Sequence, residues 1–491
     1  MSSHGVKKRK RKQAPLEETT ADEEDLRPLI EYYWRLGFND PMIATHCLDH
    51  FNRTSYGLSA KTVQRQRKEL QLSGVRQQQA TFESITPFYQ DIRERFPTMG
   101  ARNMVSLLRQ DYSIKVSERF MNRFFKEIEP DALRQRRAFR FKRKRYWSAG
   151  IMDVWCFDQH DKWKRFVLWP HLGIDPYSGK IQWLKIWWTN RNPRLVTSYY
   201  IQAGRKVGGI PLITQSDPGG ENYGIANCHT VARQRLDPTL EGTMQHRWMN
   251  KKAMNVKPEA TWSQLRRRFT PGFESILEFG VSQGLYDISK PLEKLVFRWL
   301  AIPWLQAELD AWRARYNSTP RRQDKNKILP QGIPDLIVAK PHLYGTEDYK
   351  VIVSPEMFDE TEQEWAPPDD PVFELTPPIF TKKIVEIYEN LGRPAVSSRN
   401  FWNVYSNLLD SIIDVEEELT SAIQDLDAEF EASIELLPDK PLREGANVVA
   451  GYEYYGGLAV PPPLDKDDDE GSDGAGEDPR HFADLTDVES S

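Results

Sequence analysis

The sequence predicts an α/β fold for the centre of the chain, with a mixed sheet flanked by helices. Three apolar segments with strand character, at 153–157, 166–174 and 181–188, follow one another closely. The segment 193–207 has helical spacing and a proline near its first turn, and a short apolar strand follows at 210–214. Three strands, a helix and a further strand, before more helices, are typical of an α/β domain in which the strand directions are mixed.

Two more helices are predicted beyond these strands. Residues 257–269 form a basic helix, and residues 297–316 form a long helix rich in tryptophan and leucine. We place the whole central domain at 148–345.

All-α units precede this domain. Apolar spacing predicts three short helices within 25–75, the third capped by Ser59 and rich in lysine and arginine, and this order favours a helix-turn-helix-like domain. A second helical domain is predicted at 76–132. The alternative for the first is a generic bundle with a solvated basic face. The candidate DNA contacts on the third helix are Arg65, Arg67 and Lys68.

A basic linker at 133–147 joins the helical units to the central domain. Eight of the twelve residues from 134 to 145 are positively charged. Such a block repels itself unless an anion neutralises it, and phosphate contacts with counterion release would stabilise it on nucleic acid. A solvated linker is the alternative. The candidate nucleic-acid contacts here are Arg137, Arg140, Lys142, Arg143, Lys144 and Arg145.

The N-terminal residues 1–24 are predicted to be a disordered basic tail. Residues 7–12 are all basic, which is typical of a nuclear address or a nucleic-acid arm, although a merely solvated tail is the alternative. We therefore expect a nuclear protein.

The C-terminal part is predicted to be helical and then disordered. Residues 346–400 are Pro-rich and expected to be irregular, and residues 401–436 carry a heptad-like apolar seam. The seam positions within 404–430 would either join two copies of the chain as a homo-oligomer or pack on its body. Residues 437–491 are predicted to be a disordered acidic tail.

Composition disfavours several protein classes. The three cysteines form no CxxC pair, which argues against a cysteine zinc site and favours a reducing compartment. No apolar run reaches the ~18 residues of a membrane span, and none follows the basic N-terminus as a signal peptide requires. The sequence also lacks a phosphate-cradling GxxxxGK[ST] loop and a nucleophilic-serine elbow. We expect neither a membrane nor a small-molecule cofactor as partner.

Three acidic residues stand where an α/β domain gathers a site. Asp158 ends the first strand pattern, Asp217 follows the short fourth strand, and Glu259 lies early on the basic helix. Phosphodiester chemistry needs an activated nucleophile and a stabilised leaving oxygen, which two Mg²⁺ or Mn²⁺ ions roughly 3.5–4 Å apart supply. About three carboxylates on rigid supports can hold such ions. Other acids are alternatives: Glu274 for the third carboxylate, and Asp153, Asp161, Glu221 and Asp175, the last more simply a turn residue.

These segments resemble the integrase core of retroviruses, retrotransposons and DDE transposases, and more closely the transposon-derived integrase-core proteins of fungi and animals. The resemblance rests on Trp155-Cys156-Phe157-Asp158, on Asp217-Pro218-Gly219-Gly220-Glu221-Asn222 and on Glu259 opening a helix, and it covers about residues 145–345. Pro218 departs from the asparagine of many integrases. The resemblance implies a ribonuclease H-like integrase core, dependence on Mg²⁺, and cleavage and strand transfer of DNA.

Two functions remain open at this point. In the first, Asp158, Asp217 and Glu259 bind two metal ions in an active DNA recombination enzyme, and His160, Lys162 and Arg266 contact phosphates. In the second, the chain is a catalytically silent, domesticated DNA-binding or scaffold protein. The intact set of acids favours the first function, whereas the heptad seam and the acidic tail, which the chemistry does not need, favour the second.

Overall fold

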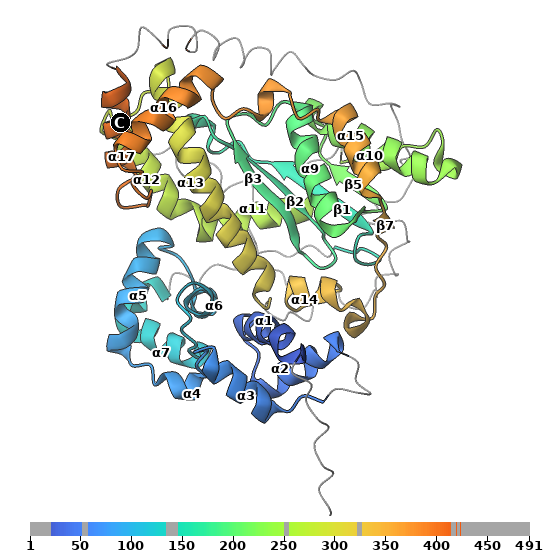
Figure 1. Ribbon diagram of the computed structural model, residues 1–491, viewed down its shortest axis with the longest axis vertical. Helices are drawn as coiled ribbons and strands as arrows, with labels where there is room; N and C mark the ends of the chain where they lie inside the picture. The colour runs from blue at the N-terminus through green and yellow to red at the C-terminus, as the bar shows by residue number, and fades with distance from the viewer. Residues whose placement is uncertain are drawn as a thin grey trace, which may run out of the picture. The chain divides into compact units, whose positions relative to one another are not determined.

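The computed structural model describes residues 21–51, 57–133, 146–249, 255–321 and 327–413, with the single positions 419 and 423. The chain forms two compact units, of which the first runs to residue 133 without residues 92–99 and the second holds residues 92–99 and the chain from 134 onward (Figure 1). The predicted basic tail lies outside the described residues as far as residue 20, but its last four residues begin the helix α1 (Ala21–Arg35), which corrects that part of the prediction. The basic block at 134–145 and the acidic tail also lie outside the described residues. The predicted domain boundaries stay predictions.

The first unit is built of helices. The three helices expected within 25–75 are present, and the third begins as expected at Ser59, whose hydroxyl accepts the backbone N–H of Thr62 at 3.1 Å. The helices of this part of the chain are α1 (Ala21–Arg35), α2 (Asp40–Cys47), α3 (Ala60–Glu69), α4 (Val75–Gln78), α5 (Phe82–Arg95), α6 (Ala101–Asp111) and α7 (Glu118–Ile128).

Arg67 on α3 is an internal ion-pair partner. Its side chain is buried, and Nε and Nη2 donate to the two carboxylate oxygens of Asp40 at 2.8 and 3.1 Å. Nη1 donates to the backbone carbonyl of Leu72. The guanidinium therefore ties α3 to the start of α2, and this placement removes Arg67 from the predicted DNA-contacting surface. Arg65 and Lys68 are exposed on the same helix.

A mixed sheet forms the centre of the second unit. Within the described residues its strand order is β3-β2-β1-β5-β6, with bounds β1 (Val154–Gln159), β2 (Trp169–Ile174), β3 (Ile181–Trp187), β5 (Ile213–Ser216) and β6 (His246–Trp248). β1, β2 and β3 pair antiparallel, whereas β5 is parallel to both β1 and β6. The predicted α/β class with mixed strand directions is confirmed.

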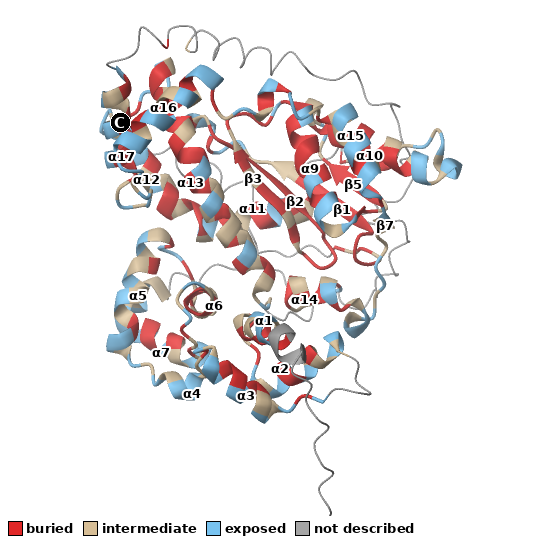
Figure 2. Ribbon diagram, viewed as in Figure 1, coloured by how far each residue is buried: buried red, intermediate tan, exposed pale blue. Residues whose placement is uncertain are grey.

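Helices cover both faces of this sheet. Successive side chains of a strand point to opposite faces. Trp155 of β1 contacts Tyr200 of α9 (Pro193–Val207), whereas Asp158 of β1 contacts Trp262 of α11 (Val256–Arg268). The strands are consequently buried on both sides, as Figure 2 shows, and this explains why β1 and β2 read as nearly continuous apolar runs.

The long helix α13 (Pro291–Ser318) covers the edge of the sheet at β3. The Gln306 amide accepts the N–H of Ile186 at 3.0 Å and donates to the carbonyl of Leu184 at 3.1 Å. Asn317 bonds in the same way to both backbone groups of Ile181, at 2.9 Å each. Side chains of α13 thereby satisfy backbone groups that an edge strand would otherwise expose.

The remaining elements complete the second unit. The helices are α10 (Tyr223–Leu236), α12 (Thr270–Ser282), α14 (Pro334–Ala339), α15 (Pro355–Trp365), α16 (Pro378–Asn390) and α17 (Phe401–Ile413). A second, two-stranded ladder pairs β4 (Gly209–Ile210) with β7 (Val351–Ile352). The short 3₁₀ turns of the whole described chain are Leu48–His50, Lys164–Phe166, Gly220–Asn222, Pro238–Leu240, Pro341–Tyr344 and Pro371–Phe373.

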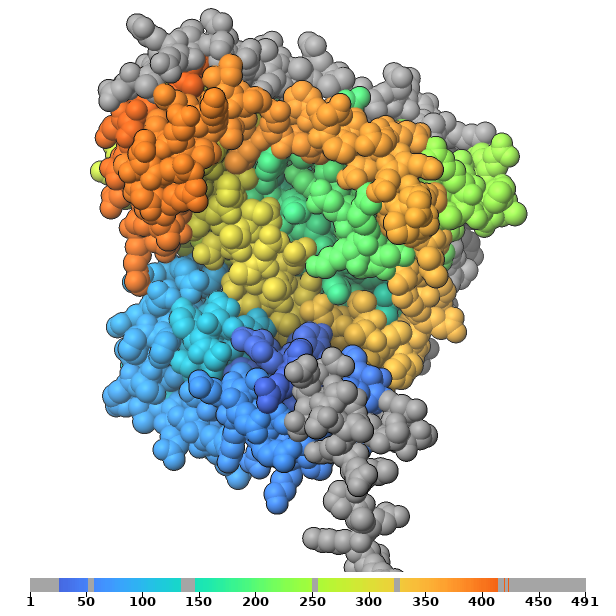
Figure 3. Space-filling view, viewed as in Figure 1, coloured from blue at the N-terminus to red at the C-terminus, as the bar shows by residue number. Residues whose placement is uncertain are grey.

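The segment 346–400, which we expected to be irregular, contains the helices α15 and α16. Its prolines do not break these helices, because Pro355 and Pro378 occupy their first turns, where a missing N–H costs nothing. Figure 3 shows the segment, in orange, along the outer side of the helices that cover the sheet.

The described part of the heptad-like seam packs on the body of its unit. Val404, Leu408 and Ile412 of α17 are buried, and the indole of Trp402 donates to the carbonyl of Ile276 on α12 at 2.7 Å. The seam beyond residue 413 lies almost entirely outside the described residues, so pairing of two copies there stays a prediction. Among the helices that the structure describes, none has the length and apolar character needed to cross a bilayer.

Replacing Arg67 with alanine tests the ion pair of the first unit. The change leaves the Asp40 carboxylate and the Leu72 carbonyl without their buried donor, so we expect α2 and α3 to lose about 2–3 kcal/mol of protection against amide hydrogen exchange. Lys68→Ala, at an exposed position of the same helix, is the control and should cost less than about 0.5 kcal/mol. Equal protection in both variants would contradict this role for Arg67.

Candidate metal-binding carboxylate site

Two of the predicted acids lie on neighbouring parallel strands. In the β1–β5 pairing Cys156 stands opposite Gln215, and Asp158 and Asp217 each follow two residues further along. Opposed residues of parallel strands point to the same face, at a strand spacing of about 4.8 Å. The register therefore brings the two acids to the same level, with Asp158 in β1 and Asp217 directly after the end of β5.

Glu259 is carried by α11, which is fastened to β1 by two hydrogen bonds. The buried Asn255 amide donates to the backbone carbonyl of Phe157 at 2.8 Å, and the indole Nε1 of Trp262 donates to Oδ2 of Asp158 at 3.1 Å. Glu259 follows Asn255 by four residues, and Trp262 follows Glu259 by three. Residues at these spacings lie on one face of a helix, so the three side chains share one face of α11 and of the residue just before it. The first turn of α11 is thereby held beside Asp158, and the exposed Glu259 side chain lies in that turn.

Electrostatics show that the three carboxyl groups lie close enough to influence one another. Burial raises the pKa of Asp158 well above its ordinary value, and the charges of Asp217 and Glu259 raise it further. Burial, followed by the charge of Glu259, raises the pKa of Asp217 to about 6. The hydrogen bond from Trp262 opposes the rise at Asp158. No nearby positive charge contributes to either shift among the described residues.

The three carboxylates offer oxygen ligands, which hard divalent cations prefer. A bound divalent cation would also neutralise their uncompensated negative charge. Within the described residues, however, no three His, Cys, Asp or Glu side chains are grouped closely enough to hold one ion together. A two-ion arrangement does not require this, because pairs of carboxylates can share the ions. Asp158 with Asp217, and Asp158 with Glu259, are the pairs that the electrostatic coupling indicates.

The alternative acids are engaged elsewhere. Glu274 forms an ion pair with Arg165 and does not contribute to the pKa of Asp158 or Asp217. Asp175 accepts the N–H of Ser178 at 2.8 Å, which makes it a turn residue as expected. Asp153 is buried and accepts from Ser148, and Glu221 accepts from the amide of Gln159. Asp161 accepts from the Asn190 amide at 3.4 Å.

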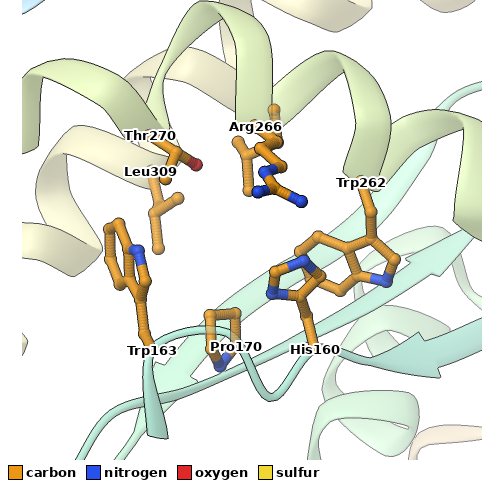
Figure 4. A pocket seen from close by; sticks show the side chains of 8 residues that line it. His160, Trp163, Pro170, Trp262, Arg266, Thr270 and Leu309 are labelled. Carbon is orange, nitrogen blue, oxygen red and sulfur yellow. The ribbon is translucent and has the colours of Figure 1, made fainter. Parts of the chain in front are cut away.

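A pocket with mainly apolar lining is formed in part by Trp262, the residue that bonds Asp158 (Figure 4). The side chain of Arg266 extends between Trp163 and Trp262 toward His160. Burial, followed by the charges of Lys162 and Arg266, lowers the pKa of His160 to about 4, so this imidazole is neutral at pH 7 and carries no charge for a phosphate. Arg266 is half-buried and Lys162 is exposed.

The structure therefore brings three of the residues that the sequence singled out, Asp158, Asp217 and Glu259, within electrostatic range of one another, whereas Arg266 lines the pocket beside Trp262. Lys162 is exposed and lies two residues after His160 in the sequence. The candidates Arg137, Arg140, Lys142, Arg143, Lys144 and Arg145 lie outside the described residues. Sequence reasoning missed Asn255 and Trp262. Their one signal was their spacing of four and three residues from Glu259.

The five-stranded mixed sheet is flanked by helices, and acids lie on two adjacent parallel strands and on a nearby helix. A sheet of this strand order with these flanking helices is a ribonuclease H-like fold. Residues 146–333 match the sequence model of the integrase core domain family. This match supports an integrase core domain of the retroviral integrase and ribonuclease H-like superfamily within residues 146–333. None of the curated proteins matches the chain.

The raised pKa of Asp217 predicts how this site changes stability with pH. The pKa of Asp217 in the folded state, about 6, lies above the ordinary value of 3.8. Between these two pH values the folded protein therefore keeps the Asp217 proton, whereas the unfolded chain has released it. The free energy of unfolding therefore falls as pH rises through this window. The Asp217→Asn variant cannot ionise at this position and so avoids this decrease in the free energy of unfolding. Without divalent cations, the variant should be more stable than the unchanged protein at pH 7 by about 1–2 kcal/mol after solvent screening.

Calorimetric unfolding at pH 4 and pH 7 checks this expectation. The stabilisation by Asp217→Asn should nearly vanish at pH 4, where the natural side chain is itself protonated. Asp335→Asn is a matched control, because that carboxylate pairs with Lys180 at 3.0 Å. A variant at Asp217 that is destabilised at pH 7, or stabilised equally at both pH values, would refute the electrostatic description.

Proposed function

We propose that this chain is a metal-dependent DNA polynucleotidyl transferase, which cleaves DNA phosphodiesters and joins the 3′ ends to a target strand. The observation that carries the proposal is the electrostatic coupling of Asp158, Asp217 and Glu259 on an integrase core scaffold. Two Mg²⁺ or Mn²⁺ ions would supply activation of water or of a 3′ hydroxyl and stabilisation of the leaving oxygen.

The residues of the chain have distinct roles in this proposal. Asp158 sits in the middle strand of the sheet and is anchored by Trp262, so it provides the most rigid ligand. Asp217 provides the second ligand from the end of β5, and Glu259 provides an exposed and adaptable third from α11. Lys162 and Arg266 would neutralise phosphate oxygens of DNA, because Lys162 is exposed two residues after His160 and Arg266 lines the same pocket as His160 and Trp262.

DNA is the proposed macromolecular partner. Arg65 and Lys68 are exposed on α3, whose place as third helix of a helix-turn-helix-like domain suits contact with DNA. The basic block at 134–145, which lies outside the described residues, would add phosphate contacts. A nuclear location is proposed from the basic residues 7–12 and from this choice of partner.

The alternative is a catalytically silent DNA-binding or scaffold protein. One observation favours it: the three acids are not gathered tightly enough to hold one ion together. The absence of any competing cation at Asp158 and Asp217 among the described residues favours the active enzyme, because a silent site has no reason to keep two partly buried acids unneutralised.

A nicking and strand-transfer assay with supercoiled plasmid and labelled oligonucleotides tests the proposed reaction. We expect product only with Mg²⁺ or Mn²⁺, and loss of at least about a hundredfold in rate for Asp158→Asn or Asp217→Asn. Glu274→Gln is the matched control, since Glu274 pairs with Arg165 instead. No metal-dependent product from the natural chain would favour the silent scaffold.

DNA affinity as a function of salt tests the proposed phosphate contact. Lys162→Ala should weaken binding to any DNA sequence and reduce the slope of log K against log salt by about one. Lys382→Ala is the control, because this exposed lysine belongs to α16, which packs on α13 and not at the acids. An unchanged slope for Lys162→Ala would exclude it from the DNA-binding surface.

A further inference from the structure

The helix that carries Glu259 bonds to two consecutive residues of β1. Asn255 holds the backbone carbonyl of Phe157, and Trp262 holds the side chain of the next residue, Asp158. The first bond fixes the start of the helix, and only the second reaches a carboxylate oxygen of the proposed site. Both donors are buried, with 0% of Asn255 and 6% of Trp262 exposed.

We propose that Trp262 is a positioning residue, whose indole N–H holds the Asp158 carboxylate in one orientation for binding a divalent cation. The inference rests on the proposed function, since it assigns a role in metal binding at the same site. Trp262 does not itself bind the ion, because an indole N–H is a donor only. It acts through Asp158, whose Oδ2 it engages at 3.1 Å.

The surroundings of Trp262 make its donor rigid. Its ring lies 5.0 Å from the ring of His160, centroid to centroid, and it lines the pocket together with Leu265 and Arg266 (Figure 4). A carboxylate held by a fixed donor loses less rotational freedom when it binds an ion than a carboxylate that turns freely. Partners that orient a metal ligand in this way typically contribute about 10–100-fold to metal affinity.

The competing explanation is that Trp262 only fills space between α11 and the sheet. Two substitutions separate the donor from the bulk. Trp262→Phe keeps an aromatic ring and removes the N–H. Trp262→His has a smaller ring, but its Nε2 occupies the position in the five-membered ring that Nε1 occupies in the indole, so it retains a donor there.

The experiment is calorimetric titration of the full-length variants with Mn²⁺ alone, without DNA. We expect Trp262→Phe to weaken Mn²⁺ binding about tenfold and Trp262→His to retain most of the affinity. Trp304→Phe is the matched control, because the buried indole N–H of Trp304 has no hydrogen-bond partner among the described residues and its removal should leave Mn²⁺ binding unchanged.

Asp217→Asn separates failure of this inference from failure of the proposed function. If the natural chain binds Mn²⁺ and Asp217→Asn abolishes binding, while Trp262→Phe binds as tightly as the natural chain, the positioning role is overturned and the metal site stands. If Trp262→His binds as weakly as Trp262→Phe, bulk explains the loss and the positioning role is again overturned. Absence of any Mn²⁺ binding that depends on Asp217 would instead overturn the proposed function.

Discussion

The parallel pairing of β1 with β5 is the interaction on which the candidate site depends. Its register sets Cys156 beside Gln215, and the same register carried two residues further sets Asp158 beside Asp217. A slip of one residue would turn one of the acids to the opposite face of the sheet. The antiparallel pairing of β1 with β2 and the parallel pairing of β5 with β6 hold both strands from the outside. The helix α11 then adds Glu259 to a pair of acids whose position is already fixed.

This arrangement places negative charge where the protein does little to compensate it. Burial and mutual repulsion raise the pKa of Asp158 and of Asp217, so the site opposes folding at neutral pH. Elsewhere in the second unit, acids and bases are paired. Arg205 of α9 pairs with Glu362 of α15 at 2.7 Å, and Arg235 of α10 pairs with Glu364 at 2.7 Å. Acids of the segment after residue 350 thus neutralise cations on α9 and α10, whereas no cation of the described residues contributes to the pKa of Asp158 or Asp217.

Much of this architecture could be predicted from the sequence, and the failures have physical causes. The helix at 193–207 was predicted with its observed bounds, because a proline at its first turn and regular apolar spacing are local signals. The strand β6 was missed because three residues, His246–Trp248, are too few to show alternation. The helices α15 and α16 were missed because the proline content of 346–400 indicated irregular structure, whereas Pro355 and Pro378 stand at first turns. Trp262 and the internal role of Arg67 were missed because each depends on a partner distant in sequence, Asp158 and Asp40, which no local pattern reveals.

The account rests on three carboxylates from distant parts of the chain serving one ion-binding site on a ribonuclease H-like sheet. Anomalous scattering from crystals grown with Mn²⁺ tests this most directly, because it locates the ions without relying on any activity. The account predicts density for Mn²⁺ within roughly 2–2.5 Å of oxygens of both Asp158 and Asp217, with Glu259 turned toward the same ions. Ions bound only at other acids, such as Glu274, or no ordered ion near Asp158 at saturating Mn²⁺, would contradict it.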